Sequence, residues 1–461
     1  MRELFIEVSY LSASILFILG LRSLSSPATA RRGMFQAELG MLLAVVGTLV
    51  KHEIVRYDWI AGGLIIGSVI GALMAIYVPM TAMPQRIAIS HMFGAIAATL
   101  VGIIEYVNTG GNVGNVTMAA LGFEVLFGSL TITGSFIAFA KLQELMTGRP
   151  IIYKFQNVMN LSLFFVACCI LVYLAFYPTN AALFYTMIGL GLMFGVLMVT
   201  RIGGADMPVV ISLLNSYAGL ASAATGFVLG NRVLIIAGAL DGASGFLLSL
   251  IMSRAMNRSF ANVLFGGFGA VNTSVTEIRS AEGLTVHSIS AEDAAIQLAY
   301  ARSVIIVPGY GMAVAQAQHQ VQELASTMEE RGVDVKYAIH PVAGRMPGHM
   351  NVLLAEANVP YDKLYEMERI NDEFDRADVA LVVGANDVVN PAAKNDSSSP
   401  IYGMPILNVE HAKSIIVLKR SMNPGFSGIE NDLFYNPKTS MLFGDAKASL
   451  TALVGEVKKV S

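Results

Sequence analysis

Long apolar stretches, separated by short turns that carry Pro, Gly, Asn or charge, fill the first part of the chain. A helix needs about 20 mainly apolar residues to cross the hydrocarbon core of a bilayer. The pattern therefore predicts an α-helical membrane domain of about nine transmembrane helices over residues 1–259. The predicted spans lie near residues 4–21, 34–50, 59–77, 87–107, 118–140, 159–177, 181–200, 208–228 and 233–253.

The pattern changes at about residue 288, where short β-branched runs begin to alternate with helical stretches. This alternation is typical of a doubly wound parallel sheet. We therefore predict a soluble α/β Rossmann-like domain over residues 286–461, joined to the membrane domain by a linker over residues 260–285. The strand-like runs cover residues 303–307, 333–339, 379–383 and 414–418, and the helical stretches lie near 312–331, 348–358 and 445–459.

Composition agrees with this division. Of the 461 residues, 54% are hydrophobic and 14% are charged, whereas soluble domains carry about 25% charged residues. Residues 1–262 hold 14 Lys and Arg against 10 Asp and Glu, and residues 263–461 hold 16 against 23. The two cysteines, Cys168 and Cys169, are adjacent in an apolar stretch and cannot build a zinc site or an iron–sulfur cluster. We expect no metal and no nucleic-acid partner.

The charge of the connecting turns predicts the orientation of the spans. Lys and Arg concentrate in turns on the cytoplasmic side of a membrane. Ten lie in one set of turns and four in the other, which puts the N-terminus outside and the C-terminus inside, as an odd number of spans requires. The ten are Arg22, Arg31, Arg32, Arg86, Lys141, Arg149, Lys154, Arg201, Arg254 and Arg258, and the four are Arg2, Lys51, Arg56 and Arg232.

A glycine-containing turn follows the strand-like run 303–307 and opens a helical stretch, which is the context of a dinucleotide-binding fingerprint. Gly309 permits a tight turn, and Gly311 lets the backbone approach a pyrophosphate. The alternative is a strand–helix turn that binds nothing. The predicted loop comprises Gly309, Tyr310, Gly311, Met312, Ala313 and Val314, with Val314 in place of the usual Gly or Ala.

Two features favour NADP(H) over NAD(H). An NAD site carries Asp or Glu at the end of the second strand to bind the ribose 2′-hydroxyl, but here the run 333–339 leads into His340 and Pro341. By contrast, the run 414–418 leads into two cations and a hydroxyl, which suit a 2′-phosphate. These are Lys419, Arg420 and Ser421.

Two further loops follow strand-like runs, at the edge where such sheets bind ligands. One contains Gly384, Asn386 and Asp387, and the other, over residues 342–349, contains Gly344. A plain connecting loop is the alternative for both.

His91 is the only histidine within a predicted span. An ionisable group at membrane depth is costly and indicates a functional site, and histidine changes charge near physiological pH. We predict a proton relay; the alternative is a hydrogen-bonded structural histidine. Asn215 would line the same path, and Asp206 lies at the inner end of the eighth span. Glu38, Glu105, Glu124 and Asp241 are also embedded in the spans or nearly so.

Seven motifs, in the same order along the chain, resemble the beta-subunit family of proton-translocating NAD(P) transhydrogenases. The resemblance implies that hydride passes between NAD(H), bound by a separate alpha subunit, and NADP(H), bound by this chain. It also implies that protons cross the membrane domain. The motifs lie at residues 203–210, 214–217, 308–317, 340–345, 384–387, 419–422 and 443–447.

The resemblance assigns roles to individual residues. His91 and Asn215 would belong to the proton path and Asp206 to the coupling region. Phe426 stands where the family commonly has Tyr, and Asp241 has no counterpart in the family pattern. The residues expected at the cofactor are Gly309 to Val314, Gly344, Arg345, Gly384, Asn386, Asp387, Lys419, Arg420, Ser421, Gly425, Phe426, Asp445 and Ala446.

The same resemblance implies a multi-pass protein of the bacterial inner membrane, with a periplasmic N-terminus and a cytoplasmic C-terminal domain, and a dimer of alpha–beta units. The alternative function is a nucleotide-gated transporter or channel with a regulatory Rossmann-like domain. A sensing domain of that kind generally has an acid after its second strand, which is absent here.

Overall fold

The computed structural model divides the chain into two compact units, a helical one that runs from Met1 to Leu250 and an α/β one that extends to the C-terminus. The predicted linker over residues 260–285 lies outside the described residues except at positions 260, 263 and 285. The structure describes residues 1–50, 56–79, 82–147, 151, 153–203, 206–255, 260, 263, 285–344, 348–396, 399, 401–425 and 428–460.

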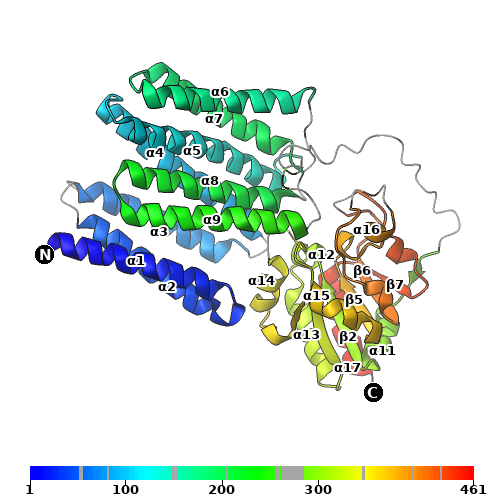
Figure 1. Cartoon of the computed structure of the whole chain (residues 1–461). Helices are drawn as coiled ribbons and strands as arrows, with labels where there is room; N and C mark the ends of the chain where they lie inside the picture. The colour runs from blue at the N-terminus through cyan, green and yellow to red at the C-terminus, as the bar shows by residue number, and fades with distance from the viewer. Residues whose placement is uncertain are drawn as a thin grey trace. The chain divides into compact units, whose positions relative to one another are not determined.

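The helical unit contains nine long helices among its described residues, one for each predicted span (Figure 1). By length and composition, eight of them can cross a membrane. The exception is α2, whose apolar content is lowered by Arg31, Arg32 and Glu38. The helices are α1 (Arg2–Leu24), α2 (Pro27–Leu49), α3 (Tyr57–Tyr77), α4 (Met83–Thr109), α5 (Asn115–Leu142), α6 (Gln156–Phe176), α7 (Ala181–Thr200), α8 (Met207–Val228) and α9 (Arg232–Ala255).

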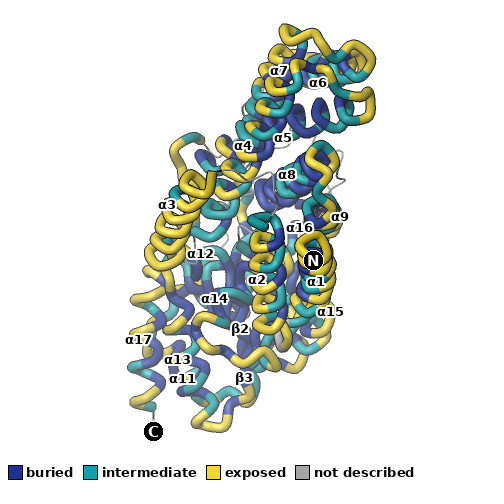
Figure 2. The backbone as a smooth tube through the Cα atoms, turned by 90° about the vertical axis from the view of Figure 1, so that its left-hand side faces the viewer, coloured by how far each residue is buried: buried dark blue, intermediate teal, exposed yellow. Residues whose placement is uncertain are grey.

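Helices α5 and α8 form the centre of this unit, whereas α3 has no buried residue (Figure 2). Small residues let the central helices approach closely, as is usual for helices packed within a membrane. A Cβ atom at Gly195 of α7 would lie 2.2 Å from the backbone oxygen of Leu130 in α5, and one at Gly134 would lie 2.9 Å from the Leu214 side chain of α8. Glycine is therefore required at position 195, where backbone blocks a Cβ, whereas at position 134 the Leu214 side chain would have to shift.

The α/β unit is built on a seven-stranded sheet in which every pair is parallel, as predicted. The strand order is β1-β7-β6-β5-β2-β3-β4. The four predicted strands are present, and the prediction missed the short β1 and β4 and the strand β7. The strands are β1 (His287–Ser288), β2 (Ser303–Pro308), β3 (Asp334–Ile339), β4 (Leu364–Glu366), β5 (Val379–Val383), β6 (Ser414–Lys419) and β7 (Thr439–Phe443).

Both faces of the sheet are covered, which explains its continuous β-branched runs. On one face Ile305 and Val382 pack in a core with Phe374 and Phe434. On the other face the alternate residues, such as Ile306, are equally buried, and helices α11 (Ala291–Ala299), α13 (Gln318–Glu329) and α17 (Ala446–Lys459) pack together. The shorter helices are α12 (Tyr310–Val314), α14 (His349–Glu356), α15 (Met367–Ile370) and α16 (Ala392–Asn395).

The prediction of one helix over residues 312–331 was wrong. The chain forms α12 and α13 instead, with a break at residues 315–317 where Gln316 adopts a left-handed φ of 49°. Neither Gly nor Pro marks this break, so the sequence carries no signal for it.

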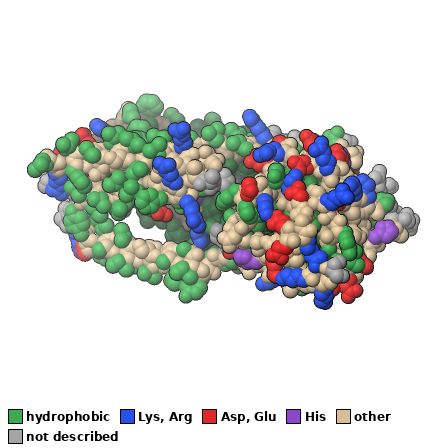
Figure 3. Space-filling view, turned by 90° about the horizontal axis from the view of Figure 1, so that it is seen from below, with side chains coloured by type: hydrophobic (Ala, Val, Ile, Leu, Met, Phe, Trp, Pro, Cys, Tyr) green, Lys and Arg blue, Asp and Glu red, His purple; other side chains and the backbone are tan. Residues whose placement is uncertain are grey.

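Figure 3 shows how differently the surfaces of the two units are composed. Apolar side chains cover one half of this view, and the charged side chains gather over the other. This matches the uneven distribution of charged residues along the sequence.

Candidate functional site

The strand order creates a topological switch point between β2 and β5, because the connections from these neighbouring strands run in opposite directions. Open α/β sheets bind ligands at such a point, beyond the carboxyl ends of the strands. The predicted fingerprint lies directly after β2, with Gly309 in the turn and Tyr310 to Val314 in α12, and the segment after β5 contains Gly384, Asn386 and Asp387. Two predicted cofactor loops therefore meet at the switch point.

These two loops are held together by their backbones. Gly309 N–H donates to the Val383 carbonyl over 2.9 Å, and Gly311 N–H donates to the Gly384 carbonyl over 2.8 Å. A Cβ at Gly309 would lie 2.4 Å from Ala385 Cα, and one at Gly384, whose φ is +67°, would lie 2.5 Å from Gly311 Cα. The glycines thus allow the two loops to touch, a reason for glycine that the fingerprint interpretation did not include.

The loop after β6 lies against the loop after β5. A Cβ at Gly425 would be 2.6 Å from Asn386 Nδ2 and 2.9 Å from Asp387 Oδ1. The buried Asn431 donates from Nδ2 to the backbone oxygen and to Oδ1 of Asn386, both over 3.0 Å. No local pattern indicates Asn431, because 45 residues separate it from its partner.

Asn386 keeps one buried donor available. Its Nδ2 has no hydrogen-bond partner among the described residues. Because a buried donor without a partner is costly, this amide at the switch point fits a ligand that offers an oxygen acceptor, as a dinucleotide does.

The cations predicted at the 2′-phosphate lie at the end of β6, at the same edge of the sheet. Lys419 donates to the Asn423 carbonyl and lies over the Phe434 ring, 5.2 Å from its centroid. Partial burial lowers the pKa of Lys419, and the nearby Asp387 opposes this effect. Arg420 and Ser421 are exposed, so a guanidinium and a hydroxyl are open to a phosphate. The residues present therefore fit a phosphorylated dinucleotide.

Asp445 caps α17 and Ala446 begins it, close to the start of the helix predicted over residues 445–459. Asp445 accepts from Lys447 N–H over 3.0 Å and from Ala448 N–H over 3.2 Å, which caps the helix. The carboxylate is therefore already engaged by the first turn of α17, which follows the carboxyl end of β7.

The loop after β3 is built around two buried histidines. His340 Nε2–H donates to the Pro405 carbonyl over 2.8 Å and its Nδ1 accepts from Val342 N–H over 3.3 Å, which fixes a neutral ring. Burial lowers the pKa of His340 to about 4. A Cβ at Gly344, whose φ is +109°, would lie 2.4 Å from His349 Nδ1. The predicted Arg345 and Phe426 lie outside the described residues.

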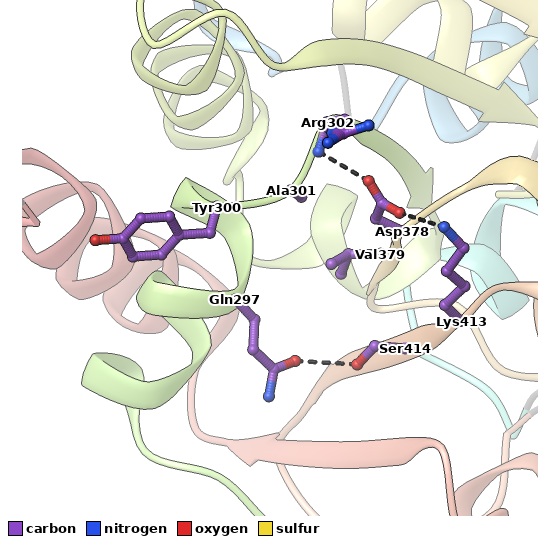
Figure 4. Close-up of a pocket in the computed structure, with 8 residues that line it drawn as sticks. All are labelled: Gln297, Tyr300, Ala301, Arg302, Asp378, Val379, Lys413 and Ser414. Atoms are coloured by element: carbon purple, nitrogen blue, oxygen red, sulfur yellow. Dashed lines mark hydrogen bonds and ion pairs between the residues drawn. The ribbon is translucent and has the colours of Figure 1, made fainter.

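A surface cavity of about 440 Å³ lies at the opposite edge of the sheet, where β2, β5 and β6 begin (Figure 4). Asp378 accepts there from Arg302 N–H over 2.8 Å and pairs with Lys413 over 2.7 Å. These contacts tie the starts of three strands together and hold the pKa of Asp378 low, with the Lys413 bond as the largest cause. The cavity therefore lies at the edge opposite the predicted cofactor loops, and the contacts that line it stabilise the sheet.

In the membrane domain the structure brings His91 and Asn215 together. His91 of α4 lies within hydrogen-bonding reach of the Asn215 side chain of α8, and its Nδ1 is buried without a partner among the described residues. Asn215 Nδ2 donates in turn to Asp241 Oδ1 of α9 over 3.0 Å. The two predicted residues thus join a third, Asp241, whose role the sequence left open.

Asp206 does not belong to this group. It precedes α8 and is buried, and nine residues of helix separate it from Asn215, a rise of about 13 Å. Near the C-terminal ends of α5 and α7, Lys141 donates to the carbonyls of Thr200 and Ile202 over 2.5 and 2.8 Å. Asp206 therefore lies among groups at the end of the spans, apart from His91.

Glu124 is a second buried polar group in this unit. It is fully buried in α5, against Thr225 of α8 and Gly102 of α4. A Cβ at Gly102 would lie 3.2 Å from its Oε1. Gly102 is eleven residues along α4 from His91, a rise of about 16 Å, so Glu124 lies beside the same two helices at a different depth.

Comparison with known proteins gives a consistent answer over nearly the whole chain. The model of the NAD(P) transhydrogenase beta subunit family matches residues 6–456. Two proteins named NAD(P) transhydrogenase subunit beta, one from Rhodospirillum rubrum and one from a designated strain of that species, are each 50% identical over 455 residues. Each alignment covers 97% of this chain and 97% of the relative. The chain therefore belongs to the NAD(P) transhydrogenase beta subunit family.

Proposed function

We propose that this chain binds NADP(H) and conducts protons as one subunit of a transhydrogenase. Membership of the family makes it part of an oxidoreductase that works with an alpha subunit and couples hydride transfer between NAD(H) and NADP(H) to proton translocation. The family match over residues 6–456 carries the proposal. A nucleotide-gated transporter or channel is not favoured by this match.

The cofactor edge of the α/β domain supports NADP(H) as the bound nucleotide. The loops after β2 and β5 bind the dinucleotide at the switch point, with the Asn386 amide as a donor. Arg420 and Ser421 bind the 2′-phosphate, and Lys419 adds positive charge from its half-buried position. NADP(H) itself, when bound, supplies the nicotinamide that gives or takes the hydride. The chain orients that ring towards NAD(H) on the alpha subunit.

The polar group in the membrane domain supports a proton path through α4 and α8. His91 carries the proton, Asn215 hydrogen-bonds to it, and Asp206, at the start of α8, belongs to the coupling region. A proton gradient then biases nucleotide binding if the protonated and neutral states of His91 favour different affinities for NADP(H).

The proposal includes a membrane topology and an assembly for the chain. The chain crosses the bacterial inner membrane nine times, with α2 as one of the spans, a periplasmic N-terminus and a cytoplasmic α/β domain. Ten Lys and Arg against four in the two sets of turns support this orientation. Two alpha–beta units form the active dimer.

Nucleotide preference is the direct test. Calorimetry on the full-length chain in detergent should show tight binding of NADPH and weak binding of NADH. Arg420→Ala should weaken NADPH binding by about tenfold to a hundredfold, because one charged hydrogen-bonded contact is lost, and should leave NADH binding unchanged. Lys419→Ala should have the smaller effect, since Lys419 donates to Asn423.

The control is Lys459→Ala, which removes one charge from the far end of α17. NADPH binding should be unaffected by it. Equal binding of NADPH and NADH by the unsubstituted chain would contradict the assignment of NADP(H) to this subunit.

A further inference from the structure

The carboxylate of Asp241 forms one end of a connected group that spans three helices of the membrane domain. Asn215 Nδ2–H donates to Asp241 Oδ1 over 3.0 Å, and His91 lies within hydrogen-bonding reach of the same amide. An amide has a donor end and an acceptor end. With the nitrogen of Asn215 turned to Asp241, its oxygen is free to accept from a ring N–H of His91.

One glycine on α8 and one on α9 make room for the contact between Asn215 and Asp241. A Cβ at Gly219 of α8 would lie 2.9 Å from Asp241 Oδ2, and a Cβ at Gly245 of α9 would lie 2.9 Å from Asn215 Nδ2. Each polar side chain thus occupies space that a glycine of the opposite helix leaves open. The two glycines therefore leave the room in which the carboxylate of Asp241 and the amide of Asn215 lie.

An acid within a span is expensive unless it is paired. An ionised carboxylate accepts hydrogen bonds and cannot donate them, so it admits only one orientation of the neighbouring amide. A hydrogen bond to a charged acceptor is also stronger than one between neutral groups, by roughly twofold. Asp241 therefore favours the orientation of the Asn215 amide that turns its nitrogen to the carboxylate. A neutral neighbour would favour it less strongly.

We propose that Asp241 is a positioning residue of the proton path, which holds the Asn215 amide with its oxygen turned towards His91. This role rests on the proposed function of His91 and Asn215. Asp241 carries no proton in this scheme. It sets the geometry in which His91 gives or accepts one.

The test uses the full chain assembled with its alpha subunit in proteoliposomes. Proton movement is followed with an internal pH-sensitive dye, and hydride transfer by the absorbance of an NAD analogue. Asp241→Leu removes the acceptor while it keeps the branched shape of the side chain, and should slow proton movement by on the order of tenfold, the factor expected when one charged hydrogen bond is lost. Asp241→Asn should have an intermediate effect, since its amide permits both orientations of Asn215.

A conservative variant distinguishes a positioning role of Asp241 from a role in stabilising the fold alone. Asp241→Glu keeps a carboxylate acceptor and should retain proton movement within about threefold of the unsubstituted rate, because the hydrogen bond to a carboxylate is kept. Ser222→Ala is the matched control. Its hydroxyl donates within α8 to the Ala218 carbonyl over 2.9 Å, so deletion removes a polar group that contacts none of the three residues. All variants should bind NADPH as the unsubstituted chain does.

Two results would overturn the proposal for Asp241. One is an Asp241→Leu variant that moves protons at the unsubstituted rate. The other is an equal loss in Asp241→Glu and Asp241→Leu, accompanied in both by a lower melting temperature, which would show a structural role. Failure of the proposed function is a separate outcome: a His91→Ala variant that still pumps protons would remove His91 from the path whatever the Asp241 variants do.

Discussion

Both domains depend on backbones that approach within contact distance, but they achieve this differently. In the α/β domain the contact joins loops, and Gly384 meets Gly311 with a left-handed φ of +67°. In the membrane domain the contact joins helices, and Gly195 of α7 meets Leu130 of α5 with ordinary helical geometry. Glycine in the first case provides both conformational freedom and space, and in the second case space alone.

The largest effect should follow substitution at the loop contact. Gly384→Ala adds left-handed strain to a Cβ that would lie 2.5 Å from Gly311 Cα, so we expect a loss of about 4 kcal/mol in the free energy of unfolding. Gly332→Ala is the matched control, because Gly332 has a φ of +86° and open space around its Cβ position. It should cost about 1 kcal/mol from strain alone. Chemical denaturation of the full chain measures both, and equal costs would refute the packing contribution.

A smaller loss should follow substitution at the helix contact. Gly195→Ala places a Cβ 2.2 Å from the Leu130 carbonyl oxygen, which cannot rotate away, and should cost about 3 kcal/mol. Gly189, on the same helix, has nothing within 4 Å of its Cβ position. Gly189→Ala should therefore leave the melting temperature in detergent unchanged or slightly higher, since Ala favours the helix over Gly by up to about 1 kcal/mol. Similar melting temperatures for Gly195→Ala and Gly189→Ala would contradict the requirement for space at the contact between α7 and α5.

The smallest effect concerns the polar core of the α/β domain. Burial lowers the pKa of His340 from 6.5 to about 4, so between these values the unfolded chain binds a proton that the folded chain does not. Stability is then full above pH 6.5 and falls as the pH falls towards 4, by about 2 kcal/mol between pH 7 and pH 4.5. Denaturation followed by circular dichroism at both pH values measures this, with His340→Gln as the variant that removes this contribution. An unchanged slope in that variant would assign the loss to other groups.

Sequence periodicity predicted the elements that are long and uniform. Each predicted span corresponds to a helix, and the buried strands β2, β3, β5 and β6 appear where β-branched runs predicted them. The edge strands β1 and β4 have two and three residues, too few to carry a periodic signal. The strand β7 begins with Thr439 and Ser440 and so lacks an apolar run.

The candidate site was predictable as residue types at strand ends, because parallel strands bring their carboxyl ends to one edge of a sheet. What could not be predicted is which of these residues contact one another. Asn431 holds Asn386 from 45 residues away, and Asp241 receives its bond from Asn215 on a different helix. Such contacts depend on how elements pack, which no local pattern contains.

The helices α8 and α9 are connected through only Leu229, Gly230 and Asn231. Their glycines bring the two backbones together at several levels, with a Cβ at Gly238 placed 2.4 Å from Ala223 N and one at Gly226 placed 2.6 Å from Ile235 N. Backbones this close leave no room for α8 to slide along α9, so the two helices move together as one rigid pair. A displacement that parts Asn215 from His91 would then occur between α4 and the α8–α9 pair as a whole, and would leave the bond between Asn215 and Asp241 intact.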